Sequence, residues 1–193
     1  MATAGVDEVG RGALFGPVVA AAVILRPDLE LWLQEQGVTD SKALTPKKRQ
    51  HLVPRIQSAS VDSQIGWVSV HRIDQINILQ ASLQAMRQAI GQLSPQPTQC
   101  LVDGNQMIPE LRIEQKTVVK GDQSVVAIAA ASIIAKVWRD TLIIRLSHRY
   151  PGYDLASNKG YGSPKHLAGL QKLGPTRYHR RSFKSCQQLS LLE

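Results

Sequence analysis

Short apolar runs bounded by glycine mark the first part of the chain, a pattern typical of buried strands. Residues 5–9 and 17–25 are predicted to form two strands joined by a glycine-rich turn, and residues 64–70 (QIGWVSV) a third with partial alternation of polar and apolar positions. Residues 100–105 (CLVDGN) and 116–122 (KTVVKGD) predict two more short strands that run into turns.

Apolar residues at three- and four-residue spacing predict the helices. Asp74 opens one helix, which the segment SPQP ends, and a long helix runs from Ser124 to about Tyr150. Ser163, followed by proline, begins a last short helix that Gly174 ends. Strands, helices and their order together indicate a mixed α/β domain with a C-terminal tail.

Two signals conflict in the segment between the second and third strands. Thr45 and Pro46 are typical of a helix start. Pro54 would then lie in the helix interior, where it lacks the N–H that a carbonyl of the preceding turn needs. We expect a kink or an early stop at Pro54.

The length of 193 residues predicts a single domain, with a core of about residues 1–150, a basic segment of about 151–184 and a tail at 185–193. The net charge of +8 favours polyanionic partners, and its distribution is more informative. From Arg145 to Lys184 there are nine Lys and Arg residues and one acid, Asp154. A basic lobe beside an acidic pocket suits a site that holds both a phosphodiester and a metal ion.

Cysteine usage and hydropathy indicate the compartment. Cys100 and Cys186 are far apart and lack CxxC spacing, so neither a disulfide framework nor a zinc site is expected, and a reducing cytoplasmic location follows. The run ALFGPVVAAAVIL is too short to span a bilayer and follows two acids where a signal peptide carries positive charge. We interpret it as a buried strand and expect no membrane partner.

Four carboxylates lie where predicted strands end: Asp7, Glu8, Asp103 and Asp122. Converging carboxylates raise one another's pKa unless a cation is present, and all-oxygen ligands suit Mg²⁺ or Mn²⁺. Taken singly, Asp103 fits a turn, Asp122 a helix cap and the adjacent pair a solvated loop. Their joint position at successive strand ends favours a metal site.

Other kinds of catalytic apparatus are missing from the sequence. The five histidines lie outside any GxSxG or Cys/His context, so acyl transfer is not supported. The segment GRGALFG does not have the GxGxxG spacing, and no Walker lysine motif occurs, which argues against nucleotide cofactors.

Eight motifs occur in a fixed order over nearly the whole chain: GVDEVGRGALFGPVVAAAVIL, DSKALTPKKR, INILQASLQAM, LVDGN, VVKGD, AAASIIAKVWRD, NKGYGSPKH and HRRSF. In these motifs the chain resembles bacterial ribonuclease HII, the type 2 ribonuclease H. The resemblance implies a ribonuclease H-like α/β fold, a five-stranded mixed β-sheet flanked by helices, with a helical C-terminal segment.

The resemblance also implies an endoribonuclease that uses two Mg²⁺ or Mn²⁺ ions held by the four carboxylates. Such an enzyme hydrolyses the RNA strand of RNA/DNA hybrids and cuts 5′ to single ribonucleotides in duplex DNA, leaving 5′-phosphate and 3′-hydroxyl ends. Its roles are ribonucleotide removal and clearance of RNA primers. The remaining acid of the long helix, Asp140, is interpreted as an ion-pair partner of a helix neighbour.

Substrate contacts are implied for five residues. The main chain of Gly10, Arg11 and Gly12 approaches the ribose 2′-hydroxyl, Lys42 contacts a substrate phosphate, and Tyr161 packs on the deoxyribose that follows the ribonucleotide. From the residues alone, Arg11 is equally a salt-bridge partner of Glu8, Lys42 an exposed lysine and Tyr161 a generic stacking residue.

A duplex-backbone surface is expected from five further residues: Lys159, Lys165, His179, Arg180 and Arg181. Lys136 of the long helix either lines the site or is solvated. The tail residues Gln188, Leu189, Ser190, Leu191 and Leu192 resemble the peptide by which bacterial proteins bind the sliding clamp; docking on the chain's own core or fraying are the alternatives.

Two other functions stay open. A non-catalytic nucleic-acid-binding domain is disfavoured because four acids without a metal would repel DNA. Type 3 ribonuclease H shares the acidic site, but it usually has an added N-terminal domain and lacks the arginine of the GRG loop. Here the first motif begins close to Met1 and Arg11 is present, so type 2 is favoured. A monomer is expected.

Overall fold

The computed structural model describes residues 2–187 and contains a five-stranded mixed sheet with the strand order β3-β2-β1-β4-β5. The strands are β1 (Thr3–Val9), β2 (Val18–Leu25), β3 (Ser60–Val68), β4 (Gln99–Asp103) and β5 (Glu114–Val118). β1, β2 and β3 form an antiparallel meander, and β4 and β5 add to β1 in parallel. The predicted strands and the five-stranded fold are confirmed.

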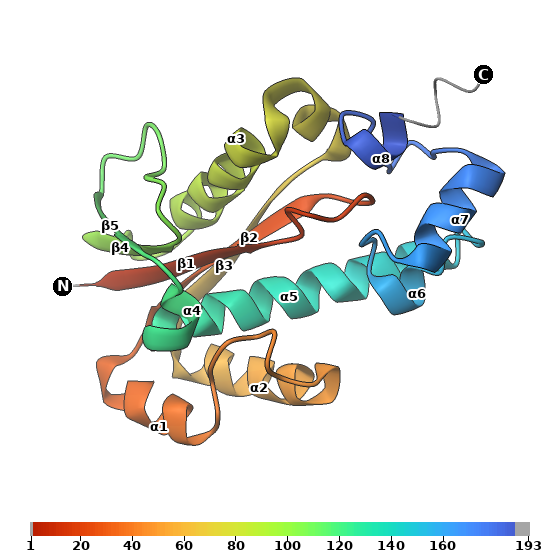
Figure 1. Ribbon diagram of the computed structural model, residues 1–193. Coiled ribbons are helices and arrows are strands. Elements are labelled where there is room, and N and C mark those ends of the chain that lie inside the picture. The colour runs from red at the N-terminus through yellow and green to blue at the C-terminus, as the bar shows by residue number, and fades with distance from the viewer. Residues whose placement is uncertain (1, 188–193) are drawn as a thin grey trace.

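Helices cover both faces of the sheet and build the C-terminal segment (Figure 1). They are η1 (Pro27–Leu29), α1 (Glu30–Glu35), α2 (Pro46–Ala59), α3 (Val70–Gly91), α4 (Gly121–Ser124), α5 (Val126–Ser147), α6 (Leu155–Asn158), α7 (Pro164–Leu173) and α8 (Lys184–Gln187). Among the described residues, no helix is both long and apolar enough to cross a membrane.

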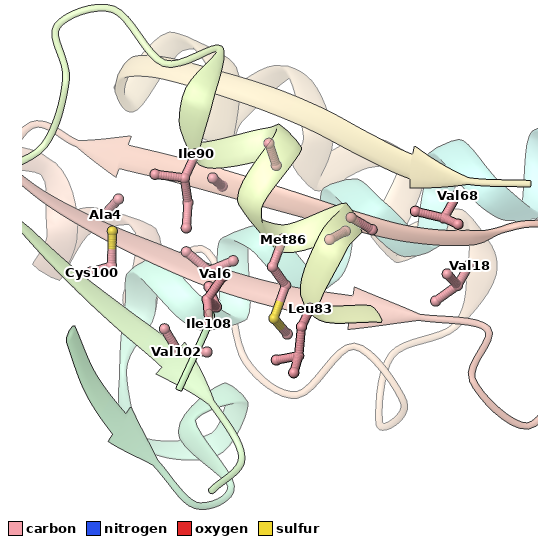
Figure 2. Packing of buried hydrophobic residues seen from close by; sticks show 14 of the residues in the cluster. Ala4, Val6, Val18, Val68, Leu83, Met86, Ile90, Cys100, Val102 and Ile108 are labelled. Carbon is pink, nitrogen blue, oxygen red and sulfur yellow. The ribbon is translucent and has the colours of Figure 1, made fainter. Parts of the chain in front are cut away.

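Strand β2 is buried on both faces, which fits its apolar residues at every position (VVAAAVIL). Even-numbered residues of β2 face α3 in one core cluster, and odd-numbered residues face α2 and α5 in another. Figure 2 shows the first cluster, where Leu83, Met86 and Ile90 of α3 pack toward Val6 and Val102 of the neighbouring strands β1 and β4.

Helix α5 lies directly against β1 because Gly5 has no side chain. A Cβ atom at Gly5 would come within 2.2 Å of the backbone carbon of Ala127, so any larger residue would push the helix away. This close approach places the first turns of α5 beside the end of β1, where two of the candidate catalytic acids lie.

Three helix boundaries differ from the predictions. Helix α2 does not stop early but continues past Pro54 to Ala59. Pro54 and Gln50 are both exposed, so water can satisfy the Gln50 carbonyl that Pro54 leaves without a donor. Helix α3 begins at Val70, earlier than Asp74, and is interrupted at Asn77 (φ 65°, ψ 166°), whose side chain accepts a hydrogen bond from the next turn. Helix α1 was not predicted.

The C-terminal segment forms its own small core against the end of α5. Phe15, Ile143, Tyr153, Leu170 and others pack together there. Two isolated β-bridges, Ala13 with Tyr161 and Phe15 with His179, join this segment to the loop that follows β1. The predicted last helix, capped by Ser163 and ended by Gly174, is confirmed.

Candidate active site

Three neighbouring strands bring the four predicted acids to one edge of the sheet. Asp7 and Glu8 lie near the end of β1, and Asp103 is the last residue of the parallel strand β4. Asp122 follows β5 in the short helix α4. Electrostatic interactions connect Asp7 with Glu8 and Asp103, and Asp103 with Asp122, so the four acids form one cluster.

Asp7 is the most strongly perturbed acid of this cluster. Its side chain is 4% exposed, and burial, together with the charges of Glu8 and Asp103, raises its pKa from 3.8 to about 8. Hydrogen bonds from Ser132 of α5 and from the Glu8 N–H (2.7 Å) oppose this rise without cancelling it. Without a cation, Asp7 therefore keeps its proton near neutral pH.

Glu8 is paired with the arginine that follows it in the loop. Arg11 Nη1 donates to Glu8 Oε1 at 3.3 Å, so the salt-bridge interpretation of Arg11 is present in the structure. Burial raises the pKa of Glu8 despite this pairing, and the charge of Asp103 adds to the effect. Half of the Arg11 side chain stays exposed. The guanidinium is thus accessible as well as paired.

Asp103 and Asp122 are held by the turn between β5 and α4. The Gly121 N–H donates to Asp103 Oδ1 at 2.8 Å. Burial and the neighbouring Asp122 raise the pKa of Asp103. Lys42 reaches this pair from the loop before α2, and its ammonium lies 3.4 Å from Asp122 Oδ2 while its side chain remains 79% exposed. A cation from a distant part of the sequence therefore faces the acids.

The chemistry of this donor set fits a divalent metal ion. All four side chains offer oxygen ligands, and burial together with the neighbouring carboxylates raises the pKa of three of them, so a bound cation would favour their charged forms. As the side chains stand in residues 2–187, no three His, Cys, Asp or Glu residues are grouped closely enough to hold a metal ion. The cations that face the acids are Lys42 and Arg11. The donor set fits the metal, but no preformed cage exists.

The glycines of the loop after β1 differ in what they require. Gly10 has a φ of +90°, and a Cβ atom there would lie 2.2 Å from Arg139 Nε. Gly12 is exposed, and a Cβ atom there would meet no other atom within 4 Å. Gly10 is therefore explained by the fold, whereas the fold itself does not require a glycine at position 12.

Tyr161 lies beside this loop. It forms a β-bridge with Ala13, and its ring has the Lys136 ammonium and the Arg139 guanidinium each 5.5 Å from its centroid. Lys136 also pairs with Asp140 at 2.9 Å, which confirms Asp140 as the ion-pair partner of a helix neighbour. Lys136 thus lies next to the aromatic ring and is not simply solvated.

Two of the five residues expected on a duplex-backbone surface are buried instead. His179 is 1% exposed and Arg180 is 0% exposed. Arg180 donates to the main-chain oxygens of Gly16 (3.1 Å) and Arg11 (2.8 Å). These buried hydrogen bonds stabilise the loop that follows β1. The prediction was wrong because both basic residues have buried partners: main-chain carbonyls accept from Arg180, and Thr176 and His166 are hydrogen-bonded to His179.

Sequence reasoning missed a second buried arginine, Arg139 of α5. It donates to the main-chain oxygens of Phe15 (2.8 Å), Pro17 (3.1 Å) and Lys159 (2.9 Å), and so joins the loop after β1 to the C-terminal segment. One feature of the sequence could have indicated this role. Arg139 lies among the mostly apolar residues of α5, and an arginine that is buried there needs hydrogen-bond acceptors inside the protein.

The remaining predicted residues lie as follows. Lys165 and Arg181 are exposed, and Lys159 is partly buried with its ammonium directed to the carbonyls of Ala156 and Ser157. These three residues stay candidates for backbone contacts. The clamp-like residues 188–192 lie outside the described residues.

Comparison with known proteins gives consistent matches. The family model described as Ribonuclease HII matches residues 4–186. A Ribonuclease HII from Acaryochloris marina is 62% identical over 95% of this chain and 93% of its own length, and one from Trichodesmium erythraeum is 60% identical over 96% and 88%.

Solved structures agree with the sequence matches. The ribonuclease H2 from Pyrococcus horikoshii superposes with a TM-score of 0.84 at 26% identity, covering 100% of this chain and 98% of that one. The PCNA:RNase HII complex from Archaeoglobus fulgidus matches with a TM-score of 0.81 at 27% identity, over 95% and 96%. The chain belongs to the ribonuclease HII family of metal-dependent endoribonucleases.

Proposed function

We propose that this endoribonuclease hydrolyses the RNA strand of RNA/DNA hybrids and cuts 5′ to single ribonucleotides in duplex DNA, leaving 5′-phosphate and 3′-hydroxyl ends. The observation that carries the proposal is the loop that links the acid cluster to Tyr161: Arg11 pairs with Glu8, the exposed Gly12 follows it, and Ala13 forms a β-bridge with Tyr161. The same loop thus connects the metal-binding acids to two groups suited to a sugar. The biological roles that follow are removal of ribonucleotides from DNA and clearance of RNA primers.

The four acids would hold the metal. When bound there, two Mg²⁺ or Mn²⁺ ions would supply a hydroxide nucleophile and stabilise the charge of the leaving 3′-oxygen. Asp7 must release its proton before it can serve as a ligand, because its pKa without a cation is about 8. Ser132 holds the Asp7 carboxyl group in place, and Ser41 in turn lies 2.8 Å from the Ser132 hydroxyl.

The loop at Gly12 and the ring of Tyr161 would contact the sugars on either side of the junction. Since nothing lies within 4 Å of a Cβ at Gly12, the backbone there is open to a ribose, and its main-chain groups can contact the 2′-hydroxyl. The half-exposed Arg11 and the exposed Lys42 would contact phosphates. The face of Tyr161 would pack on the deoxyribose that follows the ribonucleotide, because a sugar without a 2′-hydroxyl is more apolar.

The test uses one end-labelled DNA duplex that contains a single ribonucleotide. We expect Mg²⁺-dependent cleavage immediately 5′ of the ribonucleotide, no cleavage in EDTA, and no cleavage by Asp7→Asn. A duplex of the same sequence without the ribonucleotide is the control. Cleavage of long hybrids but not of this duplex would refute the roles of Gly12 and Tyr161 while the metal site stands. Binding without cleavage of either substrate would refute the whole proposal.

We infer a second partner, the sliding clamp, for the tail residues 188–192. Two things support it: the resemblance of Gln188-Leu189-Ser190-Leu191-Leu192 to a clamp-binding peptide, and the Archaeoglobus complex in which an RNase HII is bound to PCNA. Deletion of Gln188 to Glu193 should abolish co-elution with the clamp and leave cleavage of the ribonucleotide duplex unchanged. Undiminished co-elution would refute the assignment.

A further inference from the structure

A pair of buried histidines lies behind the Tyr161 loop. His166 of α7 is 0% exposed and His179 is 1% exposed, and their Nε2 atoms are 3.1 Å apart. The rings of Tyr153 and Phe15 pack on the pair, with Tyr153 4.9 Å from His179 by ring centroids and Phe15 5.0 Å from it. The two imidazoles are therefore shielded from solvent.

The hydrogen bonds around the pair determine both tautomers. The Thr176 N–H donates to His179 Nδ1 at 2.9 Å, so Nδ1 carries no proton and the proton of this ring is on Nε2. His179 Nε2–H then donates to His166 Nε2. That leaves the proton of His166 on Nδ1, which donates to the Tyr161 carbonyl oxygen at 2.8 Å. The result is a directed chain from Thr176 to Tyr161.

An added proton on either ring would break this chain. A proton on His179 Nδ1 would face the Thr176 N–H, and a proton on His166 Nε2 would face the Nε2–H of His179. Burial lowers the pKa of His166, and burial together with His166 lowers that of His179 to about 3, which agrees with two neutral rings. Tyr153 is the titratable side chain that packs on both rings.

Tyr161 lies between a buried and an exposed glycine. Gly160 (φ +84°) is buried and its carbonyl accepts from the N–H groups of Leu14 (2.8 Å) and Phe15 (3.2 Å), whereas Gly162 on the other side is exposed. The Tyr161 carbonyl accepts from Ser163 N (2.8 Å) and from His166, and His166 N donates to Ser163 Oγ (3.2 Å). His166 thus fixes the turn that carries the ring.

We propose that the chain from His179 through His166 to the Tyr161 carbonyl positions the Tyr161 ring and thereby sets the preference for an RNA-to-DNA junction. The proposal rests on the proposed function, in which Tyr161 packs on a deoxyribose. His166 and His179 are positioning residues, since neither touches substrate in this arrangement. Their effect is on discrimination between two substrates, not on the metal-dependent chemistry.

The test compares two nearly isosteric variants, His166→Asn and His166→Gln. The amide nitrogen of Asn lies near the place of Nδ1 and can still donate to the Tyr161 carbonyl, whereas that of Gln reaches the place of Nε2 and cannot. The quantity measured is the ratio of kcat/KM on a single-ribonucleotide duplex to kcat/KM on a uniform hybrid. We expect His166→Gln to lower this ratio about three- to tenfold, the worth of one hydrogen bond, and His166→Asn to retain most of it.

Tyr161→Ala is the reference variant. If it lowers the ratio while His166→Gln leaves the ratio unchanged, or if Asn and Gln reduce both substrates equally, the positioning role is refuted and the proposed function stands. An unchanged ratio in Tyr161→Ala refutes the junction assignment itself and the positioning role with it, yet leaves metal-dependent cleavage intact. The outcomes therefore separate the two proposals.

A spectroscopic measurement on the wild-type protein tests the hydrogen-bond chain itself, even if the variants fail to fold. Nitrogen-15 NMR at pH 7 should show His166 protonated on Nδ1 and His179 on Nε2, each in its neutral form. The reverse tautomers, or an imidazolium at either position, would overturn the proposal.

Discussion

Replacement of Asp7 by asparagine should stabilise the metal-free protein at neutral pH while it abolishes cleavage. Asp7 is buried among acids, so its ionisation is unfavourable in the fold. Asparagine has the same shape, its oxygen can accept from the Glu8 N–H, and its amide can donate to the Ser132 hydroxyl. The variant therefore removes a buried ionisable group, and with it the proton uptake that folding requires, without leaving an unpaired polar atom.

The magnitude follows from the pKa of Asp7, which is about 8 in the fold and 3.8 ordinarily. Between these values the folded protein holds a proton that the unfolded chain has released. The stability contribution is therefore fully present below pH 3.8 and lost as the pH rises, by about 1.4 kcal/mol per pH unit. At pH 7, about 3.2 pH units above the ordinary value, the loss amounts to about 4 kcal/mol, an upper limit because side chains and water rearrange around the charge.

The assay is thermal unfolding in EDTA at pH 5, 6 and 7. Asp7→Asn should melt at a higher temperature than the wild type. From pH 5 to pH 7 the difference in free energy of unfolding should grow by about 3 kcal/mol, which corresponds to about 6–12 °C in melting temperature for a chain of this size. Groups that titrate equally in both proteins cancel in this difference. Mg²⁺ should reduce this difference in melting temperature, because the wild type offers all four carboxylates to the ion and the variant only three.

Asp62→Asn is the matched control. Burial alone would raise the pKa of Asp62, but hydrogen bonds from the Ser94 N–H, Gln64 and the Ser63 N–H lower it below 3.8. Its stability contribution is thus present above the ordinary pKa and lost only as the pH falls below it. The variant should be less stable than the wild type by a constant amount from pH 5 to pH 7. A pH-independent margin for Asp7→Asn as well would refute the reasoning.

Three more predictions follow from the geometry. Gly12→Ala should leave the melting temperature unchanged and reduce cleavage at a single ribonucleotide. Gly10→Ala should lower the melting temperature, since its Cβ would overlap Arg139. Equal melting temperatures for the two variants would contradict this. The lowered pKa of His179 contributes stability above pH 6.5 that is lost as the pH falls, so His179→Asn should show a flatter loss of melting temperature below pH 6.5 than the wild type. Lys42→Gln should weaken duplex binding and reduce the slope of its salt dependence by about one, as measured by fluorescence anisotropy at several salt concentrations; an unchanged slope would exclude a phosphate contact.

Much of the fold could be predicted from local pattern. The all-apolar run of β2 predicted a buried strand, and apolar residues at three- and four-residue spacing predicted helix α3. Strand ends with acids predicted where the carboxylates gather. These features were predictable because they depend on the residue types and their period alone.

The interior role of basic residues was not predictable in this way. Arg180 and His179 belong to a basic motif that suggests a DNA-binding surface, and Pro54 suggests a broken helix. Their environments depend on which distant carbonyls, rings or solvent they meet after folding. Arg139 likewise gains its three acceptors only when α5, the loop after β1 and the C-terminal segment come together.

By itself, the sequence determined the strands, the long helices, the acid cluster and the family, because periodicity and ordered motifs are properties of the chain. Only the tertiary structure decided which charges face the acids, which of two glycines is required by packing, and that two histidines form a directed chain to Tyr161. The reason is physical: burial, hydrogen-bond direction and electrostatic coupling depend on distances between residues far apart in sequence, which are set only when the elements pack.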